Sequence, residues 1–205
     1  MEKEKKNGFF IGWAERSITP DKPVYLYGQF YPRISQYVDG PVMATALVIG
    51  KGKDYAVMVT CDIATINQGI RERCRTAIRE KTPEIDVSKI VLNATHTHSA
   101  PGTRGDLLPP EPEGLMTSSE YAEFFIERIA DVVDEAWKNK KEGGVSWAYG
   151  HAVVGHNRRA VYFDDLGKRQ GYSKSMGLIF DGTSKMYGNT NDPMFSHIEG
   201  YEDHG

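Results

Sequence analysis

Residues 90–102 read IVLNATHTHSAPG, an apolar run followed by two histidines and a turn. The apolar part, Ile90 to Leu92, is typical of a buried strand. Side chains at positions i and i+2 of an extended chain point the same way. The sequence therefore predicts that His96 and His98 face one pocket where the strand ends. The following Ser-Ala-Pro-Gly segment turns the chain, because proline fixes φ and glycine admits positive φ.

Two histidines at this spacing suit metal binding or proton transfer. Imidazole is the commonest metal ligand in proteins and the side chain best suited to acid–base chemistry near neutral pH. Zinc sites in hydrolases use neutral imidazole nitrogen and leave one position open for water or substrate. A histidine at the end of a strand can equally be a hydrogen-bonded polar residue, and the spacing alone leaves both roles open.

The hydrophobic pattern around this stretch predicts an α/β fold, a mixed β-sheet with flanking helices. Apolar residues at helical spacing predict a helix over 67–81 between strands 55–61 and 89–92. This order favours a parallel crossover, which places the histidines at the carboxyl edge of the sheet. The sequence Thr-Ser-Ser-Glu at 117–120 fits a capping box and begins a second amphipathic helix. Further strands are predicted over 9–14, 24–27, 145–154 and over 43–49, which forms a hairpin with 55–61.

Length and composition fit a single globular domain over residues 1–205, or part of a larger one. Hydrophobic residues make up 40% of the chain and charged residues 26%, and the formal net charge of -3 gives no reason to expect nucleic acid as a partner. No apolar run approaches the roughly 20 residues that cross a bilayer. The charged N-terminus lacks the apolar core of a secretory signal. A cytoplasmic protein is therefore expected, or an extracellular or periplasmic one if the N-terminus is incomplete.

The cysteines and the aromatic loop have less specific roles. Cys61 lies in an apolar strand and Cys74 on the predicted helix, so each is expected to be a small buried hydrophobe. The loop between Gly28 and Gly40 is rich in aromatic residues such as Tyr31 and Tyr37. These residues either pack at the edge of the core, which we favour slightly, or form one wall of a substrate pocket.

Four segments follow one another in an order that resembles a known family. They are GWAERSITP at 12–20, Asp62 at the end of a strand, NATHTHSAPG at 93–102 and Asn157-Arg158. In this order they resemble the neutral/alkaline (non-lysosomal) ceramidases, a family of zinc amidohydrolases. The resemblance spans residues 12–193, and the HTHS-x-PG run is its most specific part. It implies that this chain is an incomplete N-terminal part of a larger catalytic domain.

The resemblance implies roles for three residues. His96 takes the place of a ligand of Zn2+, and His98 takes the place of the histidine that helps bind or protonate the reacting centre. Arg158 falls on the arginine of an Asn-Arg motif that faces the active site. A guanidinium there would bind the developing oxyanion or a substrate oxygen, and a surface salt bridge is the alternative. The other zinc ligands and the nucleophilic serine are expected beyond Gly205.

Neighbouring polar residues are expected to have structural roles. Asp62 either accepts a hydrogen bond from a ligating histidine or caps the next helix, and we weigh the two equally. Asn157 is expected to orient its turn, Arg159 to form a surface salt bridge and Ser99 to shape the turn after the histidines. Polar surface or structural roles are expected for His151, His156, His197 and His204.

The resulting hypothesis is zinc-dependent hydrolysis of an N-acyl amide in a ceramide-like lipid. Two alternatives remain. One is a metal-dependent esterase or amidase that acts on a non-sphingolipid substrate, since Ala100 and Thr103 replace glycines common in the family motif. The other is an inactive fragment or degenerate homologue that acts as a binding module. We expect the 205-residue chain alone to be inactive, because it carries one predicted zinc ligand and no nucleophile.

Overall fold

The computed structural model describes residues 8–29, 31–105, 109–170 and 182–202. By their contacts the residues form two compact units, Met1–Val145 and Ser146–Gly205. Each unit has a sheet and a hydrophobic core of its own. The expectation of a single domain over residues 1–205 stays a prediction.

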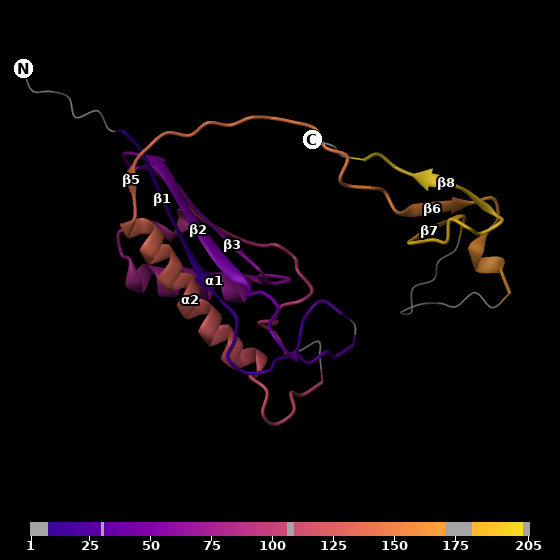
Figure 1. Cartoon of the computed structure of the whole chain (residues 1–205), viewed down its shortest axis with the longest axis horizontal. Coiled ribbons are helices and arrows are strands. Elements are labelled where there is room, and N and C mark those ends of the chain that lie inside the picture. Colours follow the sequence, from indigo (N-terminus) through magenta and orange to yellow (C-terminus); the bar gives the residue numbers. More distant parts are fainter. Residues whose placement is uncertain (1–7, 30, 106–108, 171–181, 203–205) are drawn as a thin grey trace, which may run out of the picture. The chain divides into compact units, whose positions relative to one another are not determined.

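A five-stranded mixed sheet forms the framework of the first unit, which confirms the predicted α/β class (Figure 1). Its strands are β1 (Phe9–Ser17), β2 (Met43–Lys51), β3 (Asp54–Cys61), β4 (Ile90–Ala94) and β5 (Lys141–Glu142). They lie in the order β4-β3-β2-β1-β5. Strands β3 and β4 are parallel, and the other neighbouring pairs are antiparallel. The hairpin of β2 and β3 is the one that the sequence predicts.

Helix α1 (Gln68–Lys81) connects β3 to β4. It begins after Asn67, whose side chain accepts a hydrogen bond from the Ile70 N–H at 3.0 Å. Ile70, Cys74 and Ile78 are buried, as their helical spacing predicts. Because β3 and β4 are parallel, α1 forms the expected crossover, and the chain leaves β4 at the carboxyl edge of the sheet.

Helix α2 (Ser118–Lys138) begins with the predicted capping box. The Thr117 hydroxyl accepts from the Glu120 N–H at 3.1 Å, and the Glu120 carboxylate accepts from the Thr117 N–H at 2.7 Å. The helix packs along β1 and β2 (Figure 1). At Gly12 the helix is so close that a Cβ would lie 2.2 Å from the carbonyl oxygen of Ala136. A residue without a side chain is therefore required where α2 crosses β1.

The sheet has one covered face and one open face. On the covered face, alternate residues such as Val48 and Val57 are buried in a core shared with both helices. On the other face Trp13, Met58 and Val91 lie in one row across the strands. These three side chains are 60%, 48% and 55% exposed. The helices therefore cover one face of the sheet and leave the side chains on the other face exposed.

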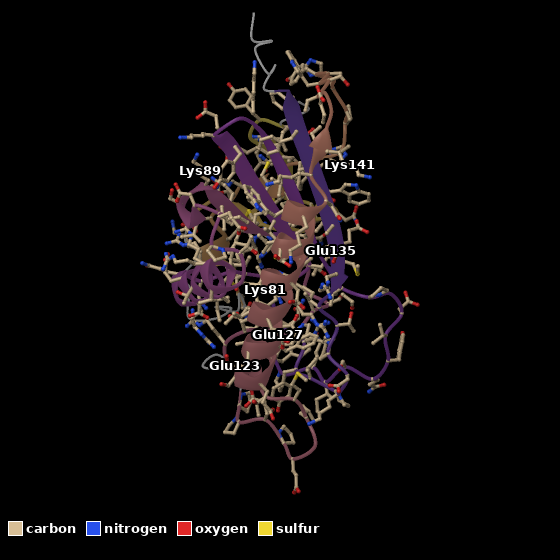
Figure 2. All side chains as sticks on the ribbon, turned by 90° about the vertical axis from the view of Figure 1, so that its left-hand side faces the viewer. Lys81, Lys89, Glu123, Glu127, Glu135 and Lys141 are labelled. Atoms are coloured by element: carbon tan, nitrogen blue, oxygen red, sulfur yellow. The ribbon has the colours of Figure 1, made fainter. Side chains whose placement is uncertain are left out.

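Ion pairs join the helices to each other and to the sheet at the surface. Lys81 at the end of α1 contacts Asp131 of α2, and Arg16 of β1 donates to Glu135 of α2 at 2.8 Å. Figure 2 labels Lys81 together with Glu127 and Glu135 of α2 on this side of the unit. Exposed pairs of this kind contribute only about 0.2–1 kcal/mol each, so apolar burial is the main source of stability here. Among the described residues, no helix is both long enough and apolar enough to cross a membrane.

A small antiparallel sheet organises the second unit, and the sequence patterns do not predict it. Its strands are β6 (Arg159–Tyr162), β7 (Ser184–Met186) and β8 (Phe195–Glu199), in the order β7-β6-β8. The core is small and consists of Ala160, Tyr162, Leu166 and Phe195. Two short 3₁₀ helices complete the two units, η1 (Val87–Lys89) before β4 and η2 (Leu166–Lys168) after β6.

Two predicted strands are wrong. Residues 145–154 form no strand, and Trp147 and Val154 are 87% and 79% exposed. An alternating apolar segment forms a strand only where a neighbouring backbone pairs with it. Strand β5, which pairs with β1, ends at Glu142, before this segment begins. Residues 24–27 make isolated bridges, Tyr25 with Ile34 and Leu26 with Pro101, and no continuous ladder.

Candidate functional site

The candidate site lies at the carboxyl edge of β3 and β4. In the last register pair of these parallel strands, Cys61 lies opposite Ala94. Beyond the strands, the Thr95 N–H donates to the Cys61 carbonyl at 2.9 Å and the His96 N–H donates to the Ile63 carbonyl at 3.1 Å. The two segments therefore continue side by side past the sheet. This confirms the predicted position of the histidines.

The backbone at His96 is left-handed, with a φ of 64°. The extended chain that the sequence pattern predicts through His96 and His98 is therefore wrong at His96. A left-handed residue other than glycine costs about 1–2 kcal/mol, although histidine tolerates this region better than most residues. The rings still meet, since their centroids are 4.8 Å apart and their planes are inclined by 80°.

The tautomer of His96 follows from its partner. Its Nδ1 lies 2.6 Å from the carbonyl oxygen of Ala64, in the buried segment after β3. A carbonyl oxygen only accepts hydrogen bonds, so Nδ1 carries a proton, and in the neutral ring Nε2 keeps a free lone pair. A hydrogen bond of this kind to the ring nitrogen away from the metal is typical of metal-binding histidines.

The two histidines direct the same nitrogen toward each other. Nε2 of His98 lies 3.3 Å from Nε2 of His96. Without a cation, the His98 Nε2–H can donate to the lone pair on His96. Two nitrogens that each bind a tetrahedral zinc ion at about 2.0–2.1 Å are separated by about 3.3–3.4 Å, so an ion beside both rings is compatible with this spacing. Among the described residues, no group of three or more His, Cys, Asp or Glu side chains could hold a metal ion.

A pocket of about 820 Å³ adjoins the same turn. Thr97 and Ser99 line it, whereas His96 and His98 do not. The pocket and the imidazoles therefore use different sides of one short segment. The other lining residues of the pocket include Asp21, Val24, Leu26, Ile34, Tyr37, Asp39 and Asp62.

Residues 34–40 of the aromatic loop form a wall of this pocket, as one of the two interpretations predicts. Tyr37 lines the pocket and is 82% exposed, whereas Tyr31, which is 59% exposed, is not among the lining residues. Packing at the edge of the core is therefore wrong for these two rings. Composition could not separate the alternatives, because an aromatic residue is equally suited to a core edge and to a pocket wall.

Asp62 has neither of the roles considered for it. Its carboxylate accepts from the Met43 N–H at 3.0 Å, and its own N–H donates to the Met43 carbonyl at 2.9 Å. The helix cap is Asn67, and the partner of the His96 ring is the carbonyl of Ala64. Asp62 therefore closes the end of the β2–β3 hairpin and lines the pocket. No side-chain pattern could have identified Ala64, because its contribution is a backbone oxygen.

Arg158 belongs to the second unit, where it is exposed. Its guanidinium lies over the ring of Tyr187, 4.4 Å from the ring centroid. Arg159 pairs with Glu199 at 3.9 Å, and the Asn157 side chain accepts from the Arg159 N–H at 3.0 Å. These contacts confirm the structural roles expected of Arg159 and Asn157. The place of Arg158 in an active site with His98 stays a prediction.

The remaining histidines have surface positions where they are described. His151 lies against Tyr149, and His156 is 3.4 Å from Glu202. His197 contacts Ser196 at 3.0 Å. All three histidines are exposed, as expected, and His204 lies outside the described residues.

Both cysteines are free and buried. Burial raises the pKa of Cys61 far above its ordinary range and that of Cys74 to about 12. A thiol that stays protonated at neutral pH is a poor nucleophile. The predicted role as small buried hydrophobes is confirmed.

The comparisons with known proteins identify relatives of the fold. No protein-family model and no curated protein sequence matches the chain. Among solved structures, the neutral ceramidase from Pseudomonas aeruginosa is similar, with a TM-score of 0.62 and 19% sequence identity. That match covers 76% of this chain and 25% of the other. A ceramidase complexed with C2 has a TM-score of 0.56 and 17% identity, and the match covers 76% of this chain and 24% of the other.

These similarities agree with the motifs around His96. Both matched structures are ceramidases, although their sequences differ from this one at most positions. At such identities the shared feature is the fold. The chain spans about a quarter of the length of these ceramidase structures. It therefore has the fold of one part of a neutral ceramidase.

Proposed function

We propose that this chain carries part of the active site of a zinc-dependent amidohydrolase that cleaves the N-acyl amide bond of a ceramide-like lipid. The observation that carries the proposal is the position of His96. Its Nδ1 is bound to the Ala64 carbonyl and its Nε2 lies 3.3 Å from Nε2 of His98, on a fold shared with neutral ceramidases.

Each residue has a specific task in this proposal. Nε2 of His96 would hold Zn2+, and the ion, when bound, would supply a Lewis acid for the scissile carbonyl. His98, when protonated on both ring nitrogens, would give its Nε2 proton to the departing amine and return to the neutral imidazole. The role that the resemblance implies for Arg158, a substrate oxygen bound through its guanidinium donors, stays a prediction. The nucleophile and the other zinc ligands that the resemblance implies stay a prediction.

The test uses the longest natural protein that contains this chain. Ceramide hydrolysis is followed by release of the fatty acid, with and without a zinc chelator. We expect activity that the chelator removes and added Zn2+ restores, and no activity in His96→Ala. Hydrolysis that persists in the chelator or in His96→Ala would contradict the proposal.

A second candidate is a metal-dependent esterase or amidase for a more polar substrate. The pocket beside the histidines is lined by three carboxylates, Asp21, Asp39 and Asp62, which are poor neighbours for a wholly apolar chain. A panel of ceramides, short N-acyl amides and acyl esters separates the two candidates. Faster turnover of the short, polar substrates would favour this second activity.

A third candidate is a binding module without turnover. It is favoured by the absence, among the described residues, of a group of three or more metal-binding side chains. The 205-residue chain by itself is therefore expected to show no hydrolysis. If the longest natural protein is also inactive but retains a ligand, this third candidate is the correct one.

A further inference from the structure

A narrow loop, described over residues 24–29 and 31–35, lies against the turn that carries His98. The loop is closed by backbone hydrogen bonds, from the Leu26 N–H to the Arg33 carbonyl at 2.7 Å and from the Ser35 N–H to the Val24 carbonyl at 2.9 Å. Val24, Leu26, Ile34 and Ser35 line the pocket, and Gly28 lies against the His98 ring. The loop therefore brings a distant part of the sequence to the candidate site.

Backbone contacts fix this loop to the turn. The Tyr27 N–H donates to the Ala100 carbonyl at 2.9 Å, and Leu26 bridges Pro101. Gly102 lies beneath the Tyr27 ring, where an added Cβ would be 2.6 Å from Cδ2. Since Ala100 is fully buried, the turn has little freedom to move away from the loop.

Gly28 supports the His98 ring directly. It has a φ of 99°, a conformation that side-chain-bearing residues rarely adopt. A Cβ at this position would lie 2.4 Å from Cγ and 2.6 Å from Cδ2 of His98. The imidazole therefore rests on the bare backbone of Gly28, which leaves room for no side chain.

Arg33 holds the backbone of the same histidine. Its Nη2 donates to the His98 carbonyl oxygen. Gly28 thus supports the ring of His98, and Arg33 supports its main chain. Nε2 of His98 lies 3.3 Å from Nε2 of His96. Both supports come from one loop, so the loop determines where the His98 nitrogen lies.

We propose that Gly28 and Arg33 are positioning residues for His98, and this inference rests on the proposed function for its catalytic consequence. They act through His98 and need not touch the substrate. Displacement of a catalytic group by about 1 Å can lower a rate by about 100-fold. Changes at Gly28 or Arg33 are therefore expected to lower kcat and to leave KM nearly unchanged.

The structural part is tested by comparing two glycine variants. Gly28→Ala introduces the clash with His98 at a positive φ. Gly114→Ala is the matched control, because Gly114 has a φ of 93° but an added Cβ would meet nothing within 4 Å. Diethyl pyrocarbonate labelling, resolved by mass spectrometry, reports the accessibility of the His98 ring. Labelling of His98 should be faster in Gly28→Ala than in the wild type and unchanged in Gly114→Ala.

The catalytic part is tested in the longest natural protein that contains this chain. In Gly28→Ala, kcat for ceramide should fall by about 100-fold with little change in KM, while Gly114→Ala keeps the wild-type value. If Gly28→Ala fails to fold, Arg33→Met removes the other support without adding a clash. Arg33→Lys keeps a donor for the His98 carbonyl and should recover most of the kcat lost in Arg33→Met.

The outcomes separate this inference from the proposed function. Suppose that the wild type hydrolyses no amide, while His98 is labelled faster in Gly28→Ala and not in Gly114→Ala. The proposed function is then wrong and the positioning role is correct. If Gly28→Ala and Gly114→Ala behave alike in labelling and in kcat, the positioning role is wrong. It is also wrong if Arg33→Met keeps wild-type labelling and kcat.

Discussion

Nδ1 of His96 lies 2.6 Å from the carbonyl oxygen of Ala64, which joins the end of β4 to the segment after β3. This contact depends on the parallel pairing of the two strands, because that pairing brings both segments to one edge. It leaves Nε2 as the nitrogen available to a metal ion. The chemistry of His96 is thus set by the topology of the sheet as much as by the His-x-His motif.

The close approach of α2 to β1 at Gly12 predicts a large effect on stability. Gly12→Ala places a Cβ 2.2 Å from the Ala136 carbonyl oxygen, so helix and strand must separate. The free energy of unfolding should fall by about 1–3 kcal/mol. Urea denaturation measures the change. Gly144→Ala is the control, since its Cβ would meet nothing within 4 Å, and an equal loss there would contradict the packing argument.

The capping box of α2 predicts a smaller effect. Thr117→Ala removes the hydroxyl that accepts from the Glu120 N–H at 3.1 Å. Loss of an N-cap of this kind costs about 1 kcal/mol of unfolding free energy. The same urea experiment measures it, and Thr117→Ser, which keeps the acceptor, should stay near the wild type. A Thr117→Ala variant as stable as Thr117→Ser would show that the cap contributes nothing.

Glu120 predicts a dependence of stability on pH. Hydrogen bonds from the backbone and the hydroxyl of Thr117 hold the pKa of Glu120 below its ordinary value. A lowered pKa in the folded state adds stability above the unfolded-state pKa of about 4.3, and this stability is lost as pH falls through the folded-state pKa. Glu120→Gln should therefore be less stable than the wild type near neutral pH and approach it in acid.

The control for this pH experiment is Glu113→Gln, at an exposed position of the preceding loop. Urea midpoints are compared for both variants and the wild type at neutral and acidic pH. A difference between Glu120→Gln and the wild type that is constant across the whole range would rule out the carboxylate as its source.

The buried cysteines predict a simple chemical result. Burial holds the pKa of Cys61 well above its ordinary range and raises that of Cys74 to about 12. Neither thiol should react with a disulfide reagent at neutral pH while the protein is folded, and both should react in urea. The absorbance of the thiolate that the reagent releases gives the number of cysteines that have reacted. Rapid reaction of either cysteine in the native protein would contradict its burial.

The elements predicted correctly are those whose signals are local. The capping box at Thr117 and the apolar spacing from Ile70 to Ile78 depend on neighbours within a few residues, so a single sequence contains the information. The hairpin of β2 and β3 is likewise local, because a short turn joins its strands. For these elements, sequence pattern and tertiary contacts agree.

The elements that were missed depend on distant partners. The strand expected over 145–154 has a suitable alternation but no ladder, whereas β8 pairs with β6 despite a polar sequence around His197. At the site, the motif identified His96 and His98. It could not reveal the left-handed backbone of His96, the Ala64 carbonyl or the support of His98 by Gly28. These features come from backbone geometry and from residues far away in the chain.

The most direct test of the account is the zinc content of the longest natural protein that contains this chain, measured by elemental analysis for the wild type and for His96→Ala. His151→Ala, at an exposed histidine of the second unit, is the control. The account predicts bound zinc in the wild type and in His151→Ala, and its loss in His96→Ala. Equal zinc in all three proteins, or none in the wild type, would contradict the assignment of His96 as a metal ligand.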